Sequence, residues 1–166
     1  MRNSSHCLAR PSIPTRSLNS PVKEAERING LNVQVANLIF SFSSNFSERA
    51  VNHRDPSIRA SNLKEFKAVT QFCQHCAVPS ITVLPGVFQQ GWSRRKSLAV
   101  SAEMLNELTQ IARRRGVVVA FEAHVGSIFE SPKETLAFLR ANSQLRLTRT
   151  TPTSSLTAIP KATSIP

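Results

Sequence analysis

Residues Gly116–Leu139 read GVVVAFEAHVGSIFESPKETLAFL and join the clearest strand signal of the chain to a well-marked helix start. The apolar run near the beginning of this stretch is unbroken, which is typical of a strand covered on both faces. Ser131, Pro132 and Glu134 then combine an N-cap, a first-turn proline and a capping-box glutamate. The stretch therefore predicts a buried strand, a loop and a helix.

Two side chains that are suited to catalysis or metal binding follow the predicted strand. Glu122 ends the strand, and His124 lies in the loop before the next helix. In parallel α/β proteins the reactive groups gather at the carboxyl ends of strands. Glu122 and His124 are therefore candidate site residues, and an N-capping or salt-bridged glutamate is the structural alternative for Glu122.

The rest of the chain repeats the strand and helix pattern. Leu31–Phe40 is rich in branched apolar residues and predicts a strand, and Asp55 with Pro56 marks the start of a helix. A second strand is predicted over Ile81–Leu84, followed by a helix that ends before Gly116. The order strand, helix repeated three times predicts a parallel sheet with right-handed crossovers. The apolar faces comprise Ile58, Leu63, Phe66, Val69, Phe72 and Cys73 in the first of these helices, and Leu98, Met104, Leu105, Leu108 and Ile111 in the second.

The charge balance is strongly basic. Lys and Arg number 21 against 10 Asp and Glu, which gives a formal net charge of +11. Such an excess is typical of proteins with polyanionic partners, but the arginines are scattered from Arg2 to Arg149 rather than gathered on one segment. Three of them, Arg113–Arg115, close a predicted helix, where cations complement the helix dipole. Nonspecific nucleic-acid binding is therefore one candidate property.

The sequence also predicts where the chain works. No apolar stretch approaches the roughly 20 residues of a membrane span. Three cysteines cannot all pair within the chain, so a reducing, cytoplasmic location is expected. The oligomeric state is not predicted by these features.

Two stretches resemble a known family. PSITVLPG, from Pro79 to Gly86, and RRRGVVVAFEAHVGSIFESPKETLAFL, from Arg113 to Leu139, resemble the sugar phosphate isomerase/epimerase group of xylose-isomerase-like TIM barrels. The resemblance covers Leu31 to Ala141, about three βα units, and its E-x-H-V-G-S turn is the most specific part. It implies an α/β fold that is an incomplete (β/α)8 TIM barrel, because a whole barrel takes about 250 residues. The predicted domains are a disordered basic extension over 1–21, the partial barrel over 22–148 and a disordered tail over 149–166.

The same resemblance implies a site and a function. Glu122 matches the family's metal-binding glutamate, which also takes part in proton transfer. His124 matches a position beside the site, where a contact with the substrate or with the residues that surround the metal ligands is expected. Hard divalent cations prefer carboxylate oxygens, and isomerisation beside a carbonyl benefits from a Lewis acid. The implied activity is isomerisation or epimerisation of a sugar or sugar phosphate, with Mn, Mg or Zn as cofactor. Full activity is not expected of a chain of this length.

The chain departs from the family pattern after Leu147. The residues Leu145–Thr148 begin the next expected strand, which should run into Asp-Tyr-Thr-His-Phe, but the sequence continues RTTPTSSLTAIPKATSIP. Codons for Arg149–Ser154 permit Asp, Tyr, Thr, His and Phe in another reading frame. We therefore predict that the reading frame changes near Arg149. Reading the nucleotide sequence in all three frames tests this prediction.

Other motifs leave alternatives open. Cys73-Gln-His-Cys76 fits a redox pair, half a zinc site or two structural cysteines, and its place near a helix end favours the structural interpretation. His53 fits a surface loop or a second imidazole near Glu122. Two further hypotheses compete with the isomerase: an endonuclease IV-like or nonspecific nucleic-acid-binding protein, and a nonfunctional gene fragment.

Overall fold

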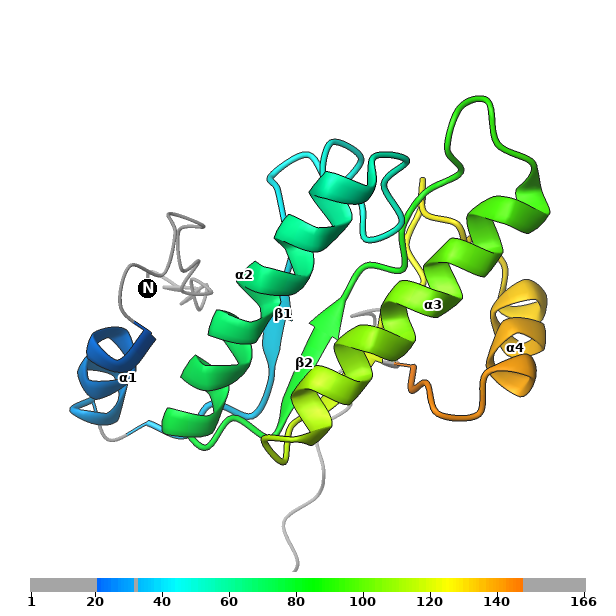
Figure 1. Ribbon diagram of the computed structural model, residues 1–166. Coiled ribbons are helices and arrows are strands. Elements are labelled where there is room, and N and C mark those ends of the chain that lie inside the picture. The colour runs from blue at the N-terminus through cyan, green and yellow to red at the C-terminus, as the bar shows by residue number, and fades with distance from the viewer. Residues whose placement is uncertain (1–20, 32, 148–166) are drawn as a thin grey trace, which may run out of the picture.

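A computed structural model describes residues 21–31 and 33–147, and the predicted extension and tail lie outside these residues apart from Pro21. Helices and strands alternate along the described chain (Figure 1). Within these ranges no helix is long and apolar enough to cross a membrane. The elements are α1 (Pro21–Asn29), β1 (Leu38–Phe40), α2 (Pro56–His75), β2 (Ser80–Val83), α3 (Arg94–Arg113), β3 (Val118–Phe121) and α4 (Pro132–Ala141).

The three strands form one parallel sheet in the order β1-β2-β3. In register, Leu38 lies beside Ile81, which in turn lies beside Val119. The parallel order confirms the predicted α/β class. It also means that all three strands end at the same edge of the sheet, here called the carboxyl edge.

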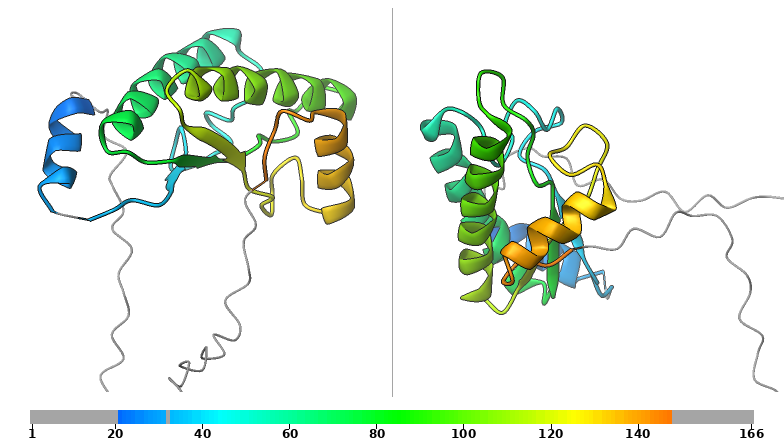
Figure 2. Two further views of the ribbon diagram at one scale, coloured as in Figure 1. Left: turned by 90° about the horizontal axis from the view of Figure 1, so that it is seen from below. Right: turned by 90° about the vertical axis from the view of Figure 1, so that its right-hand side faces the viewer.

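Helices α2 and α3 cover one face of this sheet, and α1 and α4 lie at the two ends of the helix row (Figure 2). The row that contains Leu38, Ile81 and Val119 faces these helices and contributes to the core. The alternate residues face away from α2 and α3, and among them Ile39 is 64% exposed and Val118 53% exposed. The sheet therefore has one packed face and one face that the described residues leave partly open.

Local signals for the helix starts are largely confirmed. Asp55 accepts a hydrogen bond from the backbone of Ser57 at 2.8 Å and caps α2. Ser131 accepts one from the backbone of Glu134 at 3.2 Å and caps α4. The capping-box role of Glu134 is wrong, because its carboxylate pairs with Arg94 of α3. That cation offers a charged partner that a backbone N–H cannot match.

The first predicted strand is shorter than expected. Only Leu38–Phe40 pairs with β2, and residues 33–37 before it have no regular secondary structure. The sequence pattern placed Leu31 in the strand. In the structure its N–H instead donates a hydrogen bond to the carbonyl of Ile28, which closes a turn after α1. Branched apolar residues favour a strand only where a neighbouring strand exists to pair with them.

Helix α1 is absent from the sequence-based prediction. Its signals are a proline at the first position, Glu24 in the first turn and Gly30 immediately after the last residue. The helix buries Ala25 against α2, where the carbonyl of Ala25 lies 3.9 Å from the sulfur of Cys76. Tertiary packing on α2, rather than intrinsic propensity, accounts for so short a helix.

Candidate active site

The loops that follow the three strands meet at the carboxyl edge. The N–H of Glu122 donates to the carbonyl of Val83 at 3.1 Å, which extends the pairing of β3 with β2 by one residue. The N–H of Ile128 donates to the carbonyl of Gly86 at 2.9 Å. These bonds fix the β3–α4 loop (residues 122–131) to the β2–α3 loop (residues 84–93).

Glu122 lies at the end of β3, and its carboxylate has no bonding partner among the described residues. The residue is half-buried, and no hydrogen bond or ion pair joins its carboxylate to any residue in the described ranges. A salt-bridged or N-capping role is therefore not observed in that part of the chain. A carboxylate held by the sheet yet free of partners offers two acceptor oxygens to a ligand.

His124 is exposed on the adjoining turn. Its Nδ1 lies 2.6 Å from the carbonyl oxygen of Val125, and because a carbonyl can only accept, this contact assigns the proton to Nδ1. In the neutral ring, that tautomer has Nε2 as an acceptor. The imidazole also packs edge-on against Phe46 of the β1–α2 loop, with ring centroids 5.7 Å apart. His124 therefore joins the loops after β1 and β3.

The turn that carries His124 is internally braced. The N–H of Gly126 donates to the carboxylate of Glu130 at 2.7 Å, and the hydroxyl of Ser127 donates to the carbonyl of Phe129 at 3.0 Å. The N–H of His124 in turn donates to the Ser127 hydroxyl at 3.3 Å. Glu130 and Ser127 thus position the imidazole, a role that no sequence motif indicated.

A shallow hollow lies beside this turn, between the β1–α2 loop and the end of β2. It encloses about 230 Å³ of space that includes open solvent. Neither Glu122 nor His124 lines it, but Phe46 contacts both the hollow and the imidazole. The lining residues are Phe40, Ser41, Phe42, Phe46, Arg49, Ala50, Val51, Leu84 and Gly86.

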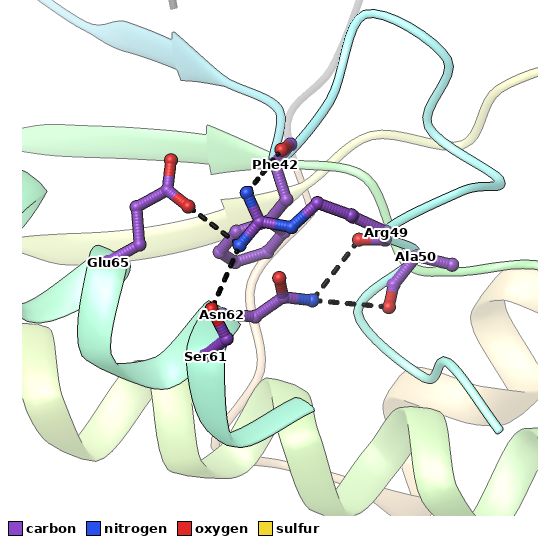
Figure 3. Close-up of polar contacts among 6 residues, drawn as sticks. All are labelled: Phe42, Arg49, Ala50, Ser61, Asn62 and Glu65. Atoms are coloured by element: carbon purple, nitrogen blue, oxygen red, sulfur yellow. Dashed lines mark hydrogen bonds and ion pairs between the residues drawn. The ribbon is translucent and has the colours of Figure 1, made fainter. Parts of the chain in front are cut away.

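Arg49, which lines this hollow, is held in place by contacts with other residues of the chain. Arg49 donates to the carbonyl of Phe42 at 3.1 Å, to the hydroxyl of Ser61 at 3.5 Å, and pairs with Glu65 at 2.8 Å (Figure 3). The side-chain nitrogen of buried Asn62 holds the same loop through the carbonyls of Arg49 and Ala50, at 3.1 and 3.4 Å. The guanidinium therefore shapes the loop and is largely committed to it.

A second buried amide joins the loops after β1 and β2. Asn52 donates to the carbonyls of Val87 and Ser97 at 2.8 and 3.2 Å and accepts from the N–H of Val87 at 3.0 Å. The hydroxyl of Ser101 adds a bond to the carbonyl of Pro85. Asn52, Ser97 and Ser101 are fully buried, and hydrophobic periodicity could not have revealed them.

The two cysteines of the C-x-x-C are buried at the end of α2 and are not bonded to each other. Burial, with a smaller contribution from Cys76, raises the pKa of Cys73 to about 12. The pKa of Cys76 is also raised, chiefly by burial. No group of three or more His, Cys, Asp or Glu side chains in the described residues is placed to hold a metal ion. This geometry agrees with the interpretation of Cys73 and Cys76 as structural cysteines.

We expect Cys73 to resist a thiol reagent in the folded protein at pH 8. The thiolate is the reactive species, and a rise from 9.0 to about 12 lowers its fraction about a thousandfold. Labelling a Cys7→Ser background with an aromatic disulfide, followed by mass spectrometry, measures this. Rapid native labelling of Cys73, at the rate found in denaturant, would contradict the expectation.

His53 does not join Glu122. Its Nδ1 accepts a hydrogen bond from the N–H of Asp55 at 3.1 Å, and its carbonyl accepts one from Arg59 at 2.7 Å. These bonds attach His53 to the start of α2. The basic residues of α3 lie at both of its ends: Arg94–Lys96 form its first turn at the carboxyl edge, and Arg113 is in its last turn. Nucleic-acid binding stays a prediction without a defined face.

Comparison with known proteins agrees with this architecture. A family profile described as xylose isomerase-like TIM barrel matches residues 13–148. No curated protein matches the chain by sequence. Among solved structures, an IolI protein with bound zinc shares 21% identity at a TM-score of 0.57, covering 77% of this chain and 45% of its own.

Two epimerases have a similar fold. The 3-keto-D-glucoside 4-epimerase YcjR from E. coli shares 14% identity at a TM-score of 0.63, with 76% of this chain and 53% of that chain covered. A D-psicose 3-epimerase from Clostridium cellulolyticum H10, solved with D-tagatose, shares 15% identity at a TM-score of 0.60. The match covers 77% of this chain and 47% of that chain. The chain thus spans about half the length of these structures. With its parallel strands, its carboxyl-edge loops and a profile match over most of its length, the chain belongs to the xylose isomerase-like TIM barrel family and comprises part of a barrel.

Proposed function

We propose that this chain carries part of the catalytic rim of a divalent-metal-dependent sugar or sugar phosphate isomerase or epimerase. The observation that carries the proposal is the partner-free carboxylate of Glu122 at the end of β3, where the loops after the strands converge. The family and the epimerases of similar fold support it. In this proposal Glu122 is a metal ligand and catalytic residue, and His124 contacts the substrate.

The chemistry follows from the two side chains. The Glu122 carboxylate takes a proton from the carbon beside the sugar carbonyl, which leaves an enediolate, and can return the proton on the same face to the former carbonyl carbon. Epimerisation needs a second carboxylic acid on the opposite face of the enediolate. The free Nε2 of His124 accepts a hydrogen bond from a sugar hydroxyl. A divalent metal, when bound, would polarise the carbonyl and so acidify that carbon.

The residues present fit one ligand of such a metal but not a complete site. A hard cation such as Mg²⁺ or Mn²⁺ needs several oxygen ligands, and the described residues offer no cluster of three candidates. We therefore propose that the chain by itself binds metal weakly and does not turn over sugar. The physical reason is that the described residues supply only part of a barrel.

Metal titration tests the role of Glu122. We expect Glu122→Gln to weaken Mn²⁺ binding at least about tenfold, because an amide lacks the charge that a hard cation prefers. Isothermal titration or the electron paramagnetic resonance signal of free Mn²⁺ measures this. Glu103→Gln is the matched control, since it removes the same charge from an exposed position on α3. Equal binding by the Glu122→Gln variant and the unmodified chain would exclude Glu122 as a ligand.

A second measurement addresses turnover. D-tagatose in D₂O reports proton exchange beside the carbonyl by NMR, and we expect no exchange above background from the chain alone. Exchange that disappears in Glu122→Gln would show that the chain is catalytically competent and would overturn the proposed lack of turnover.

A further inference from the structure

Phe46 is a large apolar side chain whose position the hydrophobic core does not explain. Of the nine phenylalanines of the chain, seven belong to the core or pack against it, whereas Phe46 and Phe88 do not. Phe88 contacts the guanidinium of Arg94, but the half-buried ring of Phe46 packs against His124. Phe46 is therefore a candidate for a role at the site rather than in the core. The seven core phenylalanines are Phe40, Phe42, Phe66, Phe72, Phe121, Phe129 and Phe138.

The turn that carries Phe46 is closed by hydrogen bonds among its own residues. The N–H of Glu48 donates to the carbonyl of Asn45 at 3.1 Å, which places Phe46 at the second position of a four-residue turn. The carboxylate of Glu48 accepts from the hydroxyl of Ser43 at 3.2 Å and from the side-chain amide of Asn45 at 3.3 Å. The hydroxyl of Ser47 donates to the side-chain oxygen of Asn45 at 2.7 Å. These bonds fix the backbone on both sides of Phe46.

The ring of Phe46 contacts the β3–α4 loop at two places. It packs edge-on against the imidazole of His124, with 71° between the two ring planes, which is one of the arrangements that aromatic pairs prefer. A β-carbon built at Gly126 would lie 3.6 Å from Cζ of Phe46, so the end of the ring lies against the backbone two residues after His124. Phe46 therefore contacts both the imidazole and the turn that carries it.

His124 depends on such a contact because its side chain is otherwise exposed. Its Nδ1 bonds to the carbonyl of Val125, the next residue, whose side chain is itself 83% exposed. Fixing an exposed side chain in one orientation costs conformational entropy. Packing against a ring on another loop opposes that cost, and the closed turn at Asn45–Glu48 keeps the ring in place.

We propose that Phe46 is a positioning residue for His124. It holds the imidazole in the orientation in which Nδ1 donates to the carbonyl of Val125 and Nε2 is the atom available to a sugar hydroxyl. Phe46 acts through His124 and does not touch the reacting carbon. The sugar contact rests on the proposed function, whereas the contact between the two rings does not. The loop after β1 thereby sets the orientation of a side chain on the loop after β3.

Nuclear magnetic resonance of the full chain, with labelled histidine and phenylalanine, tests this without metal or sugar. In the unmodified chain we expect nuclear Overhauser effects between the ring protons of Phe46 and His124. Nitrogen shifts at pH 8, where the imidazole is neutral, should place the proton on Nδ1. In Phe46→Leu the imidazole is released from this orientation. The ratio of the Nδ1-protonated to the Nε2-protonated tautomer should then fall about two- to tenfold, the factor that an aromatic pair contributes beyond its buried area.

Phe88→Leu is the matched control. It makes the same change in the other phenylalanine outside the core, and it should leave the tautomer ratio of His124 unchanged. Overhauser effects that are missing in the unmodified chain, a measurement that needs no variant to fold, would overturn the proposal. So would a Phe46→Leu protein with an unaltered tautomer ratio.

A titration with D-tagatose examines the proposed function separately. Displacement of the His124 signals by the sugar in the unmodified chain supports the substrate contact, and Phe46→Leu should reduce that displacement. Signals of His124 that do not move with sugar would contradict the substrate contact, while the Overhauser effects and the tautomer ratio still decide whether Phe46 positions the imidazole. Failure of the inference and failure of the proposed function are therefore distinguishable.

Discussion

Gly86→Ala should lower the free energy of unfolding by about 4 kcal/mol. Gly86 has a φ of +99°, a conformation that costs a residue with a side chain about 1–3 kcal/mol. A methyl group there would also lie 2.6 Å from Cγ of buried Asn52. Displacing Asn52 leaves buried partners unsatisfied at about 1–3 kcal/mol each, and these include both backbone groups of Val87.

Gly91→Ala separates the two contributions. Gly91 has a φ of +79°, but a methyl group there meets no atom within 4 Å. That variant carries the backbone strain alone and should lose only about 1 kcal/mol. Urea denaturation followed by circular dichroism measures both. A similar loss in the two variants would mean that the Asn52 contact contributes little to stability.

Phe66→Ala should lower the free energy of unfolding by about 3–5 kcal/mol, the usual cost of removing a buried aromatic ring. Phe66 on α2 is completely buried, and its ring centroid lies 6.1 Å from that of Phe40 and 6.5 Å from that of Phe42. These two rings line the hollow at the carboxyl edge. The cavity left by the substitution therefore lies directly beneath that hollow.

Phe88→Ala is the control for ring removal. Phe88 is 43% exposed, and the guanidinium carbon of Arg94 lies 4.5 Å from the centroid of its ring. Its loss should cost about 1 kcal/mol or less. Thermal and urea unfolding compare the two variants. A Phe66→Ala protein that unfolds like the Phe88→Ala protein would contradict the position of Phe66 in the core.

The features that depend on local chemistry are the ones that sequence reasoning predicted well. Asp55 and Ser131 cap helices because a side-chain oxygen near the first free N–H groups needs no distant partner. The apolar run before Glu122 predicted β3, but its expected burial on both faces is not observed in the described chain, where Val118 is exposed and Ala120 half-buried. The helix faces were predicted from their hydrophobic period, and Phe66, Val69 and Leu105 are core residues.

The errors arose where distant residues compete. Glu134 reaches Arg94, forty positions earlier, in preference to its own backbone. Leu31 belongs to the end of α1 because the strand pairing available to β1 begins only at Leu38. Neither outcome is visible in a local window, since each depends on which elements become neighbours.

By itself, the sequence determined the α/β class, the parallel order of strands and the placement of Glu122 at a strand end. Each follows from hydrophobic period, capping residues and the alternation of elements, which act over a few residues. Only the tertiary structure decided that Glu122 has no partner in the described chain, that His124 packs on Phe46, and that Asn52 fills the space beside Gly86. These contacts join loops that are far apart in sequence, and only the packing of strands and helices brings such loops together.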